Sequence, residues 1–193
     1  MENIGLSLIN TLFNLYTFML MLRFALHISY VDKKNPITQN IRKITSFIVN
    51  PVKNCIKSIG CFDLATFISA IFIKTFSISI IYLLYLNNIP PIINLFIGSF
   101  ASVLNILSRL YFFSFIIMTI LNWILNNSEH PGSKLIIQIT EPIMLLLRNI
   151  IPPIGIIDIT PIAAFIFINL IDNIIICPLI NFASLPPSIL VGY

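Results

Sequence analysis

Four long apolar stretches dominate the pattern of hydrophobic and polar positions along the chain. They run over about residues 4–30, 63–86, 100–125 and 158–180. A helix needs about 20 mostly apolar residues to cross the hydrocarbon core of a bilayer. The pattern therefore predicts four membrane-spanning helices. The apolar run before the third helix begins at Ile92, which predicts either a short interfacial turn or a broken or tilted helix there.

Two shorter segments, over residues 35–60 and 131–155, join the spans and follow a different pattern. Isoleucines recur at helical spacing on one face of the first segment: Ile37, Ile41, Ile44 and Ile48. Basic and amide side chains fall elsewhere, and Pro51 interrupts the helix. A basic amphipathic helix of this kind lies flat in the membrane interface with its apolar face toward lipid. Packing on a cytosolic partner is the alternative.

Composition excludes an ordinary soluble domain. Hydrophobic residues make up 58% of the 193 residues and charged residues only 9%, whereas a soluble protein carries about 25% charged residues. The net charge of +4 is too small and too dispersed for nucleic-acid binding. It suits contact with the bilayer and its anionic lipid headgroups.

The residue types that carry catalysis or bind metals are few. Cys55, Cys61 and Cys177 form no C-x-x-C pair, and His27 and His130 are far apart. The sequence therefore predicts no metal site, no cofactor and no disulfide framework. It has no nucleophile–base pair and no phosphate-binding glycine loop, so we expect no enzyme.

The chain matches itself when it is shifted by 95 residues. The informative matches are Pro36 with Pro131, Thr45 with Thr140, Gly60 with Gly155, and Asp63 with Asp158. This pattern predicts an internal duplication, with one unit over residues 1–86 and the other over residues 87–193. Each unit would cross the membrane twice, which makes the two units parallel repeats.

The distribution of basic residues predicts the orientation. Most of them lie in the first segment between spans: Lys33, Lys34, Arg42, Lys43, Lys53 and Lys57. By the positive-inside rule the long segments are cytoplasmic and both termini lie outside. The predicted fold is thus an all-α membrane protein of two parallel repeats, each with two transmembrane helices joined by a basic amphipathic cytoplasmic segment.

The repeated residues carry a resemblance to a known family. The first unit contributes Arg23, Asp32, Asn35, Pro36, Thr45, Gly60 and Asp63, and the second contributes Pro131, Thr140, Pro142, Arg148, Gly155 and Asp158. This pattern resembles the YggT family of small membrane proteins over nearly the whole chain. The resemblance implies the bacterial inner membrane and an association with osmotic tolerance and potassium uptake. Relatives in photosynthetic lineages are linked to cytochrome assembly, nucleoid distribution and division.

The motif residues have simple structural interpretations. Gly60 and Gly155 suit the end of an interfacial helix, and Asp63 and Asp158 suit the N-cap of the span that follows. The alternative is a pair of carboxylates that bind a cation. The prolines set the angles at which helices begin and end. Thr45 and Thr140 would bond to the helix backbone or across to the other unit.

Three charged residues fall inside spans: Lys74, Arg109 and Asp172. A charge near mid-bilayer costs at least about 2.5–3.5 kcal/mol, so it should face the bundle and be paired. We expect Asp172 to pair with Lys74 or Arg109 and to fix the packing of the two units. A cation path is the alternative. The structural role is favoured because Lys74 aligns with Asn169 in the repeat, so the charge is not duplicated.

Two function classes follow. The first is a small multi-pass protein that serves osmotic or potassium and ion homeostasis. The second is a membrane scaffold or assembly factor that recruits partners through its basic cytoplasmic surface. In both, a second copy of the chain or other membrane proteins are the expected partners.

Overall fold

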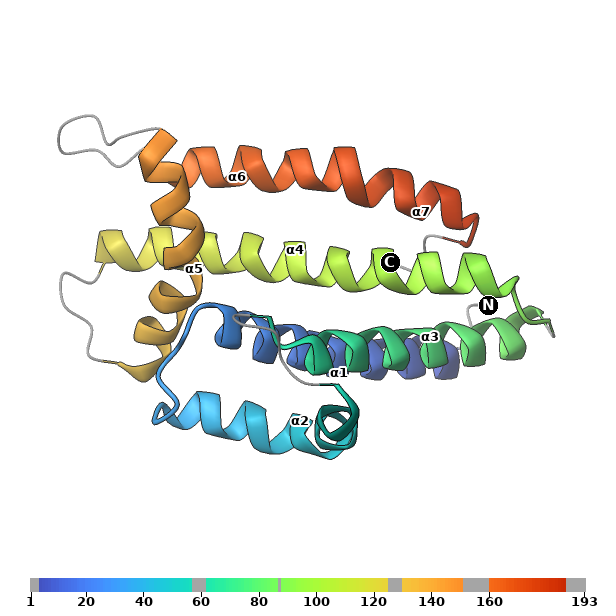
Figure 1. The fold of residues 1–193 in the computed structure, drawn as a ribbon. Coiled ribbons are helices and arrows are strands. Elements are labelled where there is room, and N and C mark those ends of the chain that lie inside the picture. Colours follow the sequence, from blue (N-terminus) through green and yellow to red (C-terminus); the bar gives the residue numbers. More distant parts are fainter. Residues whose placement is uncertain (1–3, 57–61, 87, 125–129, 151–159, 187–193) are drawn as a thin grey trace.

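In the computed structural model, the described residues are 4–56, 62–86, 88–124, 130–150 and 160–186. Helices account for nearly all of them (Figure 1). In chain order the elements are α1 (Ile4–Ile28), α2 (Pro36–Cys55), α3 (Leu64–Leu86), α4 (Ile92–Ile124), α5 (Pro131–Ile150), α6 (Thr160–Ile171), the π-helical turn η1 (Asp172–Ile176) and α7 (Cys177–Ala183). The all-helical prediction is confirmed for this part of the chain.

Four helical rods are long and apolar enough to cross a membrane: Ser7–Ile28, Leu64–Leu84, Ile92–Asn122 and Thr160–Ala183. We call these rods the spans. They run alongside one another, and the last consists of α6, η1 and α7 (Figure 1). The number of spans and their approximate places agree with the sequence prediction, and four such helices are compatible with a membrane protein.

The third span settles part of its prediction. A short interfacial turn, or a broken or tilted helix, was predicted from Ile92, and α4 is one unbroken helix of 33 residues. The turn and the break are therefore wrong, and the tilted helix stays a prediction. The physical reason is the position of the prolines. Pro90 and Pro91 stand just before the helix, where a missing backbone N–H costs nothing, and no proline lies within it. A helix of this length is about 50 Å long, which exceeds the thickness of the hydrocarbon core.

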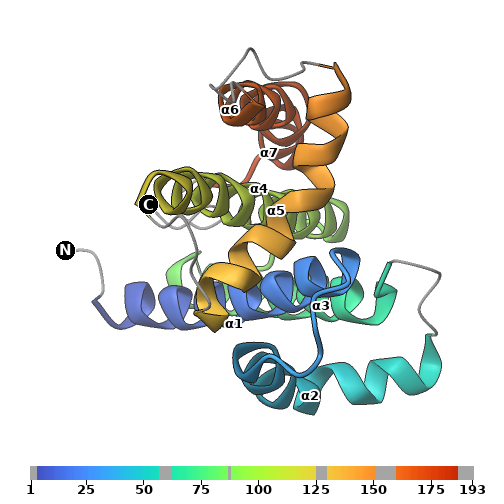
Figure 2. The ribbon, with the colours of Figure 1, turned by 90° about the vertical axis from the view of Figure 1, so that its left-hand side faces the viewer.

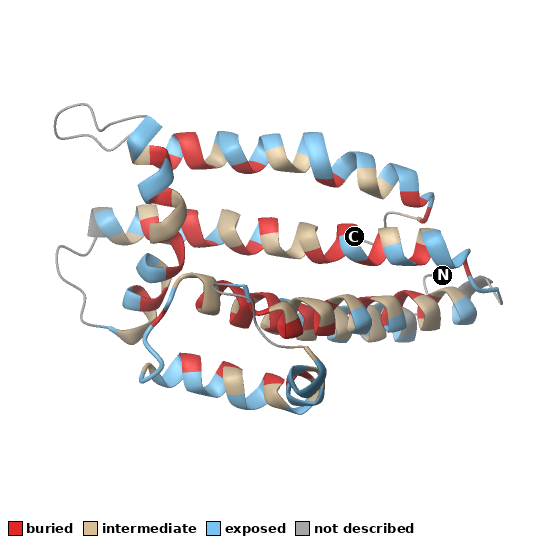
Figure 3. Ribbon diagram, in the orientation of Figure 1, coloured by how far each residue is buried: buried red, intermediate tan, exposed pale blue. Residues whose placement is uncertain are grey.

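Helix α4 lies at the centre of the molecule, because it packs against α1, α3, α5, α6 and α7. The largest apolar core gathers side chains from the first three spans, among them Leu20 of α1, Ala70 of α3 and Val103 of α4. Figure 3 shows buried positions on the facing sides of these helices and mostly exposed positions on the outer surface of the last span. The last span is therefore the edge of the bundle.

The two helices between spans differ in shape. Helix α5 crosses the ends of the spans at a large angle (Figures 1 and 2). Helix α2 bends: its first part runs in the direction of α4 and α6, and its second part runs at a large angle to the first. The position of α2 flat in the membrane interface stays a prediction. Pro51 stays within the helix instead of ending it, and a proline inside a helix removes a hydrogen bond and bends the axis.

Candidate functional site: polar residues within the bundle

The first polar cluster lies between α1 and α3, halfway along both spans. Lys74 of α3 is fully buried, and its Nζ donates a hydrogen bond of 2.5 Å to Oδ1 of Asn14. Asn14 in turn donates from Nδ2 to Oδ1 of Asn10 at 3.3 Å. A charge buried among apolar helices needs a hydrogen-bond acceptor, and the amide oxygen of Asn14 supplies it.

The second polar cluster lies between α4 and the last span. Ser108 of α4 donates from Oγ to Oδ1 of Asp172 at 2.6 Å. The neighbouring Arg109 donates from Nε to Oδ1 of Asn105 at 3.0 Å. Among the described residues, the expected ion pair of Asp172 with Lys74 or Arg109 is not formed. The partners that the structure shows for these three charges are amide and hydroxyl groups on the same or a neighbouring helix.

The two clusters occupy equivalent positions in the sequence. Three pairs of residues stand 95 positions apart: Asn10 and Asn105, Asn14 and Arg109, and Lys74 and Asn169. Each set holds one cation and two amides. In the first set the cation, Lys74, lies in the second span of the chain, whereas in the second set the cation, Arg109, lies in the third span. Sequence reasoning compared Lys74 with Asn169 alone and so concluded that the charge is not repeated. Applying the same shift to Asn14 would have found Arg109.

A third polar contact holds α2 against α1. The buried guanidinium of Arg23 donates from Nη1 to Oγ1 of Thr45 at 2.8 Å and to the carbonyl oxygen of Arg42 at 3.3 Å. The hydroxyl of Thr45 donates to the carbonyl oxygen of Ile41 at 2.7 Å. Of the bonds expected for Thr45, the structure shows the one to its own helix and a bond to α1 of the same unit.

Asp63 stands immediately before α3, as predicted. Its Oδ2 accepts a 2.8 Å hydrogen bond from the hydroxyl of Thr66 and lies 3.3 Å from Nζ of Lys53. Burial alone would raise the pKa of Asp63, but the Thr66 hydrogen bond and the charge of Lys53 outweigh burial and hold the pKa below its usual value. These contacts replace the backbone N–H bonds expected of a capping carboxylate. The nearby lysine also argues against a cation at this place.

The contacts at positions 95 residues later in the chain, in the predicted second unit, are weaker. Thr140 donates to Sδ of Met118 at 3.1 Å, and Arg148 pairs with Glu141 at 3.5 Å on the surface. Pro142 lies inside α5. Gly60, Gly155 and Asp158 lie outside the described residues, so the expected symmetry of Asp63 with Asp158 stays a prediction.

The starts of α2 and α5 meet. Asn35 caps α2, accepting at Oδ1 from the backbone N–H of Ile37 at 2.9 Å, and its Nδ2 donates to the carbonyl oxygen of Pro131 at 2.9 Å. Pro36 is the first residue of α2. Asp32 makes a local turn by accepting from the backbone N–H of Lys34 at 2.9 Å. These motif residues are therefore structural in the described contacts.

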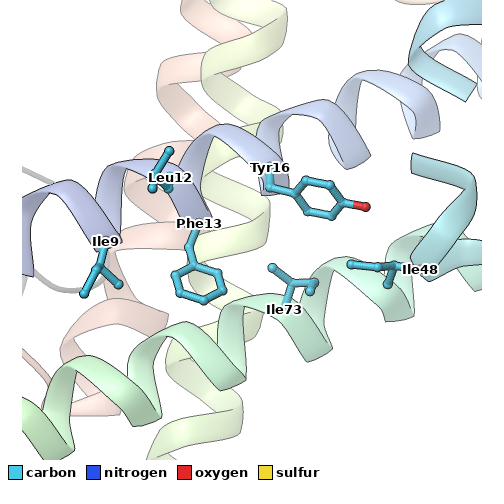
Figure 4. Close-up of a pocket in the computed structure, with 6 residues that line it drawn as sticks. All are labelled: Ile9, Leu12, Phe13, Tyr16, Ile48 and Ile73. Atoms are coloured by element: carbon cyan, nitrogen blue, oxygen red, sulfur yellow. The ribbon is translucent and has the colours of Figure 1, made fainter. Parts of the chain in front are cut away.

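One apolar pocket of about 330 Å³ opens between α1, α3 and the bend of α2 (Figure 4). Its lining is Ile9, Leu12, Phe13, Tyr16, Ile48 and Ile73. Apart from the Tyr16 phenol this lining is apolar, and it suits a lipid acyl chain. Among the residues that the structure describes, no group of three or more His, Cys, Asp or Glu side chains could hold a metal ion.

The fold and its clusters define a class: an all-helical protein with four apolar spans and polar residues halfway along them. The chain belongs to the CCB3/YggT family, whose model matches residues 3–84 and 97–179. It is 31% identical over 186 residues to an uncharacterised protein of Pseudomonas aeruginosa, which covers 96% of this chain and 94% of that protein. It is 28% identical over 165 residues to the uncharacterised protein YggT of Escherichia coli K12, covering 86% and 85%. No solved structure matches the chain.

Proposed function

We propose that the chain is a duplicated membrane protein of the bacterial inner membrane, with α2 and α5 on the cytoplasmic side and both termini outside. Three observations support the duplication. Helices α2 and α5 are both 20 residues long and begin at Pro36 and Pro131. The contact of Thr45 with Arg23 recurs, at the same separation, as that of Thr140 with Met118. The family model matches two stretches that begin 94 residues apart and end 95 residues apart.

Within this membrane the chain acts as a non-enzymatic scaffold that recruits or assembles other components. The observation that carries this proposal is the outer surface of α2. There Lys43 is exposed beside Ile44 and Phe47, and Phe47 is 85% exposed. A mixed basic and apolar surface at the membrane interface suits anionic headgroups and the apolar side chains of a partner.

Photo-crosslinking in living cells tests this role. A photoreactive amino acid at Phe47 should give a discrete protein adduct, and the variant Lys43→Gln should reduce it. The same probe at Val49, which is buried on the other side of α2, is the matched control. A Phe47 probe that reacts no more than the Val49 probe would reject the scaffold role.

Ion homeostasis is the second candidate, and the ionisable residues within the spans favour it. Potassium flux across liposomes that hold the purified protein separates the two roles. Flux above that of empty liposomes, lowered by Asp172→Asn or Asp63→Asn, would support conduction. Flux no greater than that of empty liposomes, from protein shown to be folded and inserted, would support the scaffold.

A further inference from the structure

Four polar side chains form a surface on the second unit that we call the α4–α6 polar face. They are Asn105 and Arg109 of α4, Asn169 of α6 and Asn173 of η1. Asn105 is half-buried and the other three are exposed. Besides the bond from Arg109 to Asn105, Asn173 donates from Nδ2 to the carbonyl oxygen of Asn169 at 2.9 Å.

The geometry of the two helices places these residues on one side. The bond between Ser108 and Asp172 fixes where α4 and the last span face each other. Arg109 follows Ser108 by one residue, and Asn173 follows Asp172 by one residue. Because the two helices run in opposite directions (Figure 1), a step of about 100° turns both side chains to the same side of the pair. Phe112 and Phe165, whose ring centroids lie 5.4 Å apart, pack against each other between the two helices.

This position is unfavourable for a single chain in lipid. Arg109 is about 25 Å along α4, near its middle, counted at about 1.5 Å per residue, and Asp172 begins the middle turn of the last span. Charged side chains at this depth normally face protein. The polar face thus exposes groups that a bilayer does not solvate.

The first unit shows how the same kind of cluster is shielded. There α4 packs against both α1 and α3, and Lys74 is fully buried. The shift of 95 residues makes α1 and α4 equivalent. We would therefore expect α1 to cover the second unit as α4 covers the first. Among the described elements, however, α6 packs against α4, α5 and η1 and makes no comparable contact with α1. Within the described helices, the second unit lacks the cover that α4 gives the first.

We propose that a second copy of this chain covers the α4–α6 polar face in a two-fold symmetric dimer. The face is complementary to itself: it carries the Arg109 cation, borders the half-buried Asp172 carboxylate, and holds asparagines whose amides both donate and accept. A two-fold axis brings each donor to the partner's acceptor, and such polar contacts between helices stabilise membrane assemblies. The proposal requires only that the four rods span a bilayer, and it holds whether or not the scaffold role does.

A native cysteine offers the test. Cys177 is exposed and lies one turn beyond Asn173. The full chain with Cys55→Ser and Cys61→Ser, in vesicles of phosphatidylethanolamine and phosphatidylglycerol, should form a disulfide-linked dimer through Cys177 on mild oxidation. The matched control replaces Cys177 by Ser and introduces Phe72→Cys on the exposed face of α3, and it should stay monomeric.

Variants of the polar face complete the experiment. Arg109→Leu should weaken dimerisation roughly tenfold, since two symmetric contacts are lost, each worth about threefold. Arg109→Lys keeps the cation and should lose less. Asn169→Leu serves if Arg109→Leu fails to insert, and circular dichroism checks the fold of each variant. A monomer at all protein densities, equal crosslinking at Phe72→Cys, or dimerisation unchanged by both leucine variants would overturn the proposal.

Discussion

The first and second units place similar residues in opposite environments. In the first, Lys74 is fully buried and donates to Asn14. In the second, Arg109 stands at the position equivalent to Asn14 and is exposed, as is Asn169 at the position equivalent to Lys74. The difference follows from packing: α4 covers the pair α1 and α3, whereas the last span lies at the edge of the bundle. Residues that the predicted duplication makes equivalent are therefore buried in the packing of one unit and exposed on the surface of the other.

The ends of the spans beside α2 and α5 differ in the same direction. Arg23 and Met118 stand at equivalent positions, and each meets the equivalent threonine. In the first unit the contact is a charge-assisted hydrogen bond, while in the second it is a weak bond to sulfur. The first unit is thus held together by stronger polar contacts.

The largest expected effect comes from removing the acceptor of Lys74. Asn14→Leu leaves a buried ammonium without its hydrogen-bond partner and should lower the free energy of unfolding by about 3 kcal/mol. Arg109→Leu at the equivalent exposed position should change the free energy of unfolding of the monomer by less than about 0.5 kcal/mol. Denaturant unfolding in micelles measures both. Equal losses would show that the two environments do not differ.

A swap at the contact between Arg23 and Thr45 comes next. Arg23→Met gives the first unit the residue of the second and removes two hydrogen bonds from a charged donor, so it should cost about 2 kcal/mol. The loss should be local, with faster hydrogen exchange in α2 and little change in α5. Met118→Arg is the reciprocal variant and should also destabilise, because it buries a charge. If α2 exchanges at the same rate in Arg23→Met as in the parent protein, Arg23 does not hold that helix.

The sequence predicts the spans well because hydrophobic length is a local property. It also identified Asn35, Asp63 and Thr45 through their spacing, and these residues do lie at helix starts or between helices. The error over Asp172 has a different origin. Which neighbour a buried charge finds depends on how the helices are rotated, and apolar sequences with little periodicity within the spans do not specify that rotation. Ser108 and Asn14 carry no sequence signal as partners, because isolated polar residues in a span look alike.

The bend of α2 shows the same limit. Pro51 indicated an interruption, but proline inside a helix either ends it or bends it, and the choice depends on what packs around the freed carbonyl group. In this chain Val49 and Thr45 pack against the spans on the near side of Pro51. That packing keeps the helix continuous. The local pattern therefore indicated where the axis of α2 is perturbed. Tertiary contacts determined that the helix bends there and does not end.

The smallest effect concerns pH, and it separates the ion pairs of the two units. Because the pKa of Asp63 is lowered in the folded state, the stabilisation by its ionised form is fully present above about pH 4, the ordinary carboxyl value, and is lost as pH falls through the lowered pKa. Lys53 is 40% exposed, so solvent screens its attraction to Asp63, and the loss should be only about 1 kcal/mol.

Asp63→Asn should remove this acid dependence. Glu141→Gln, which breaks the exposed pair with Arg148, should leave it unchanged. Thermal melts in micelles between pH 3 and 7 measure both, and an acid dependence lost in Glu141→Gln rather than in Asp63→Asn would assign the stronger ion pair to the second unit.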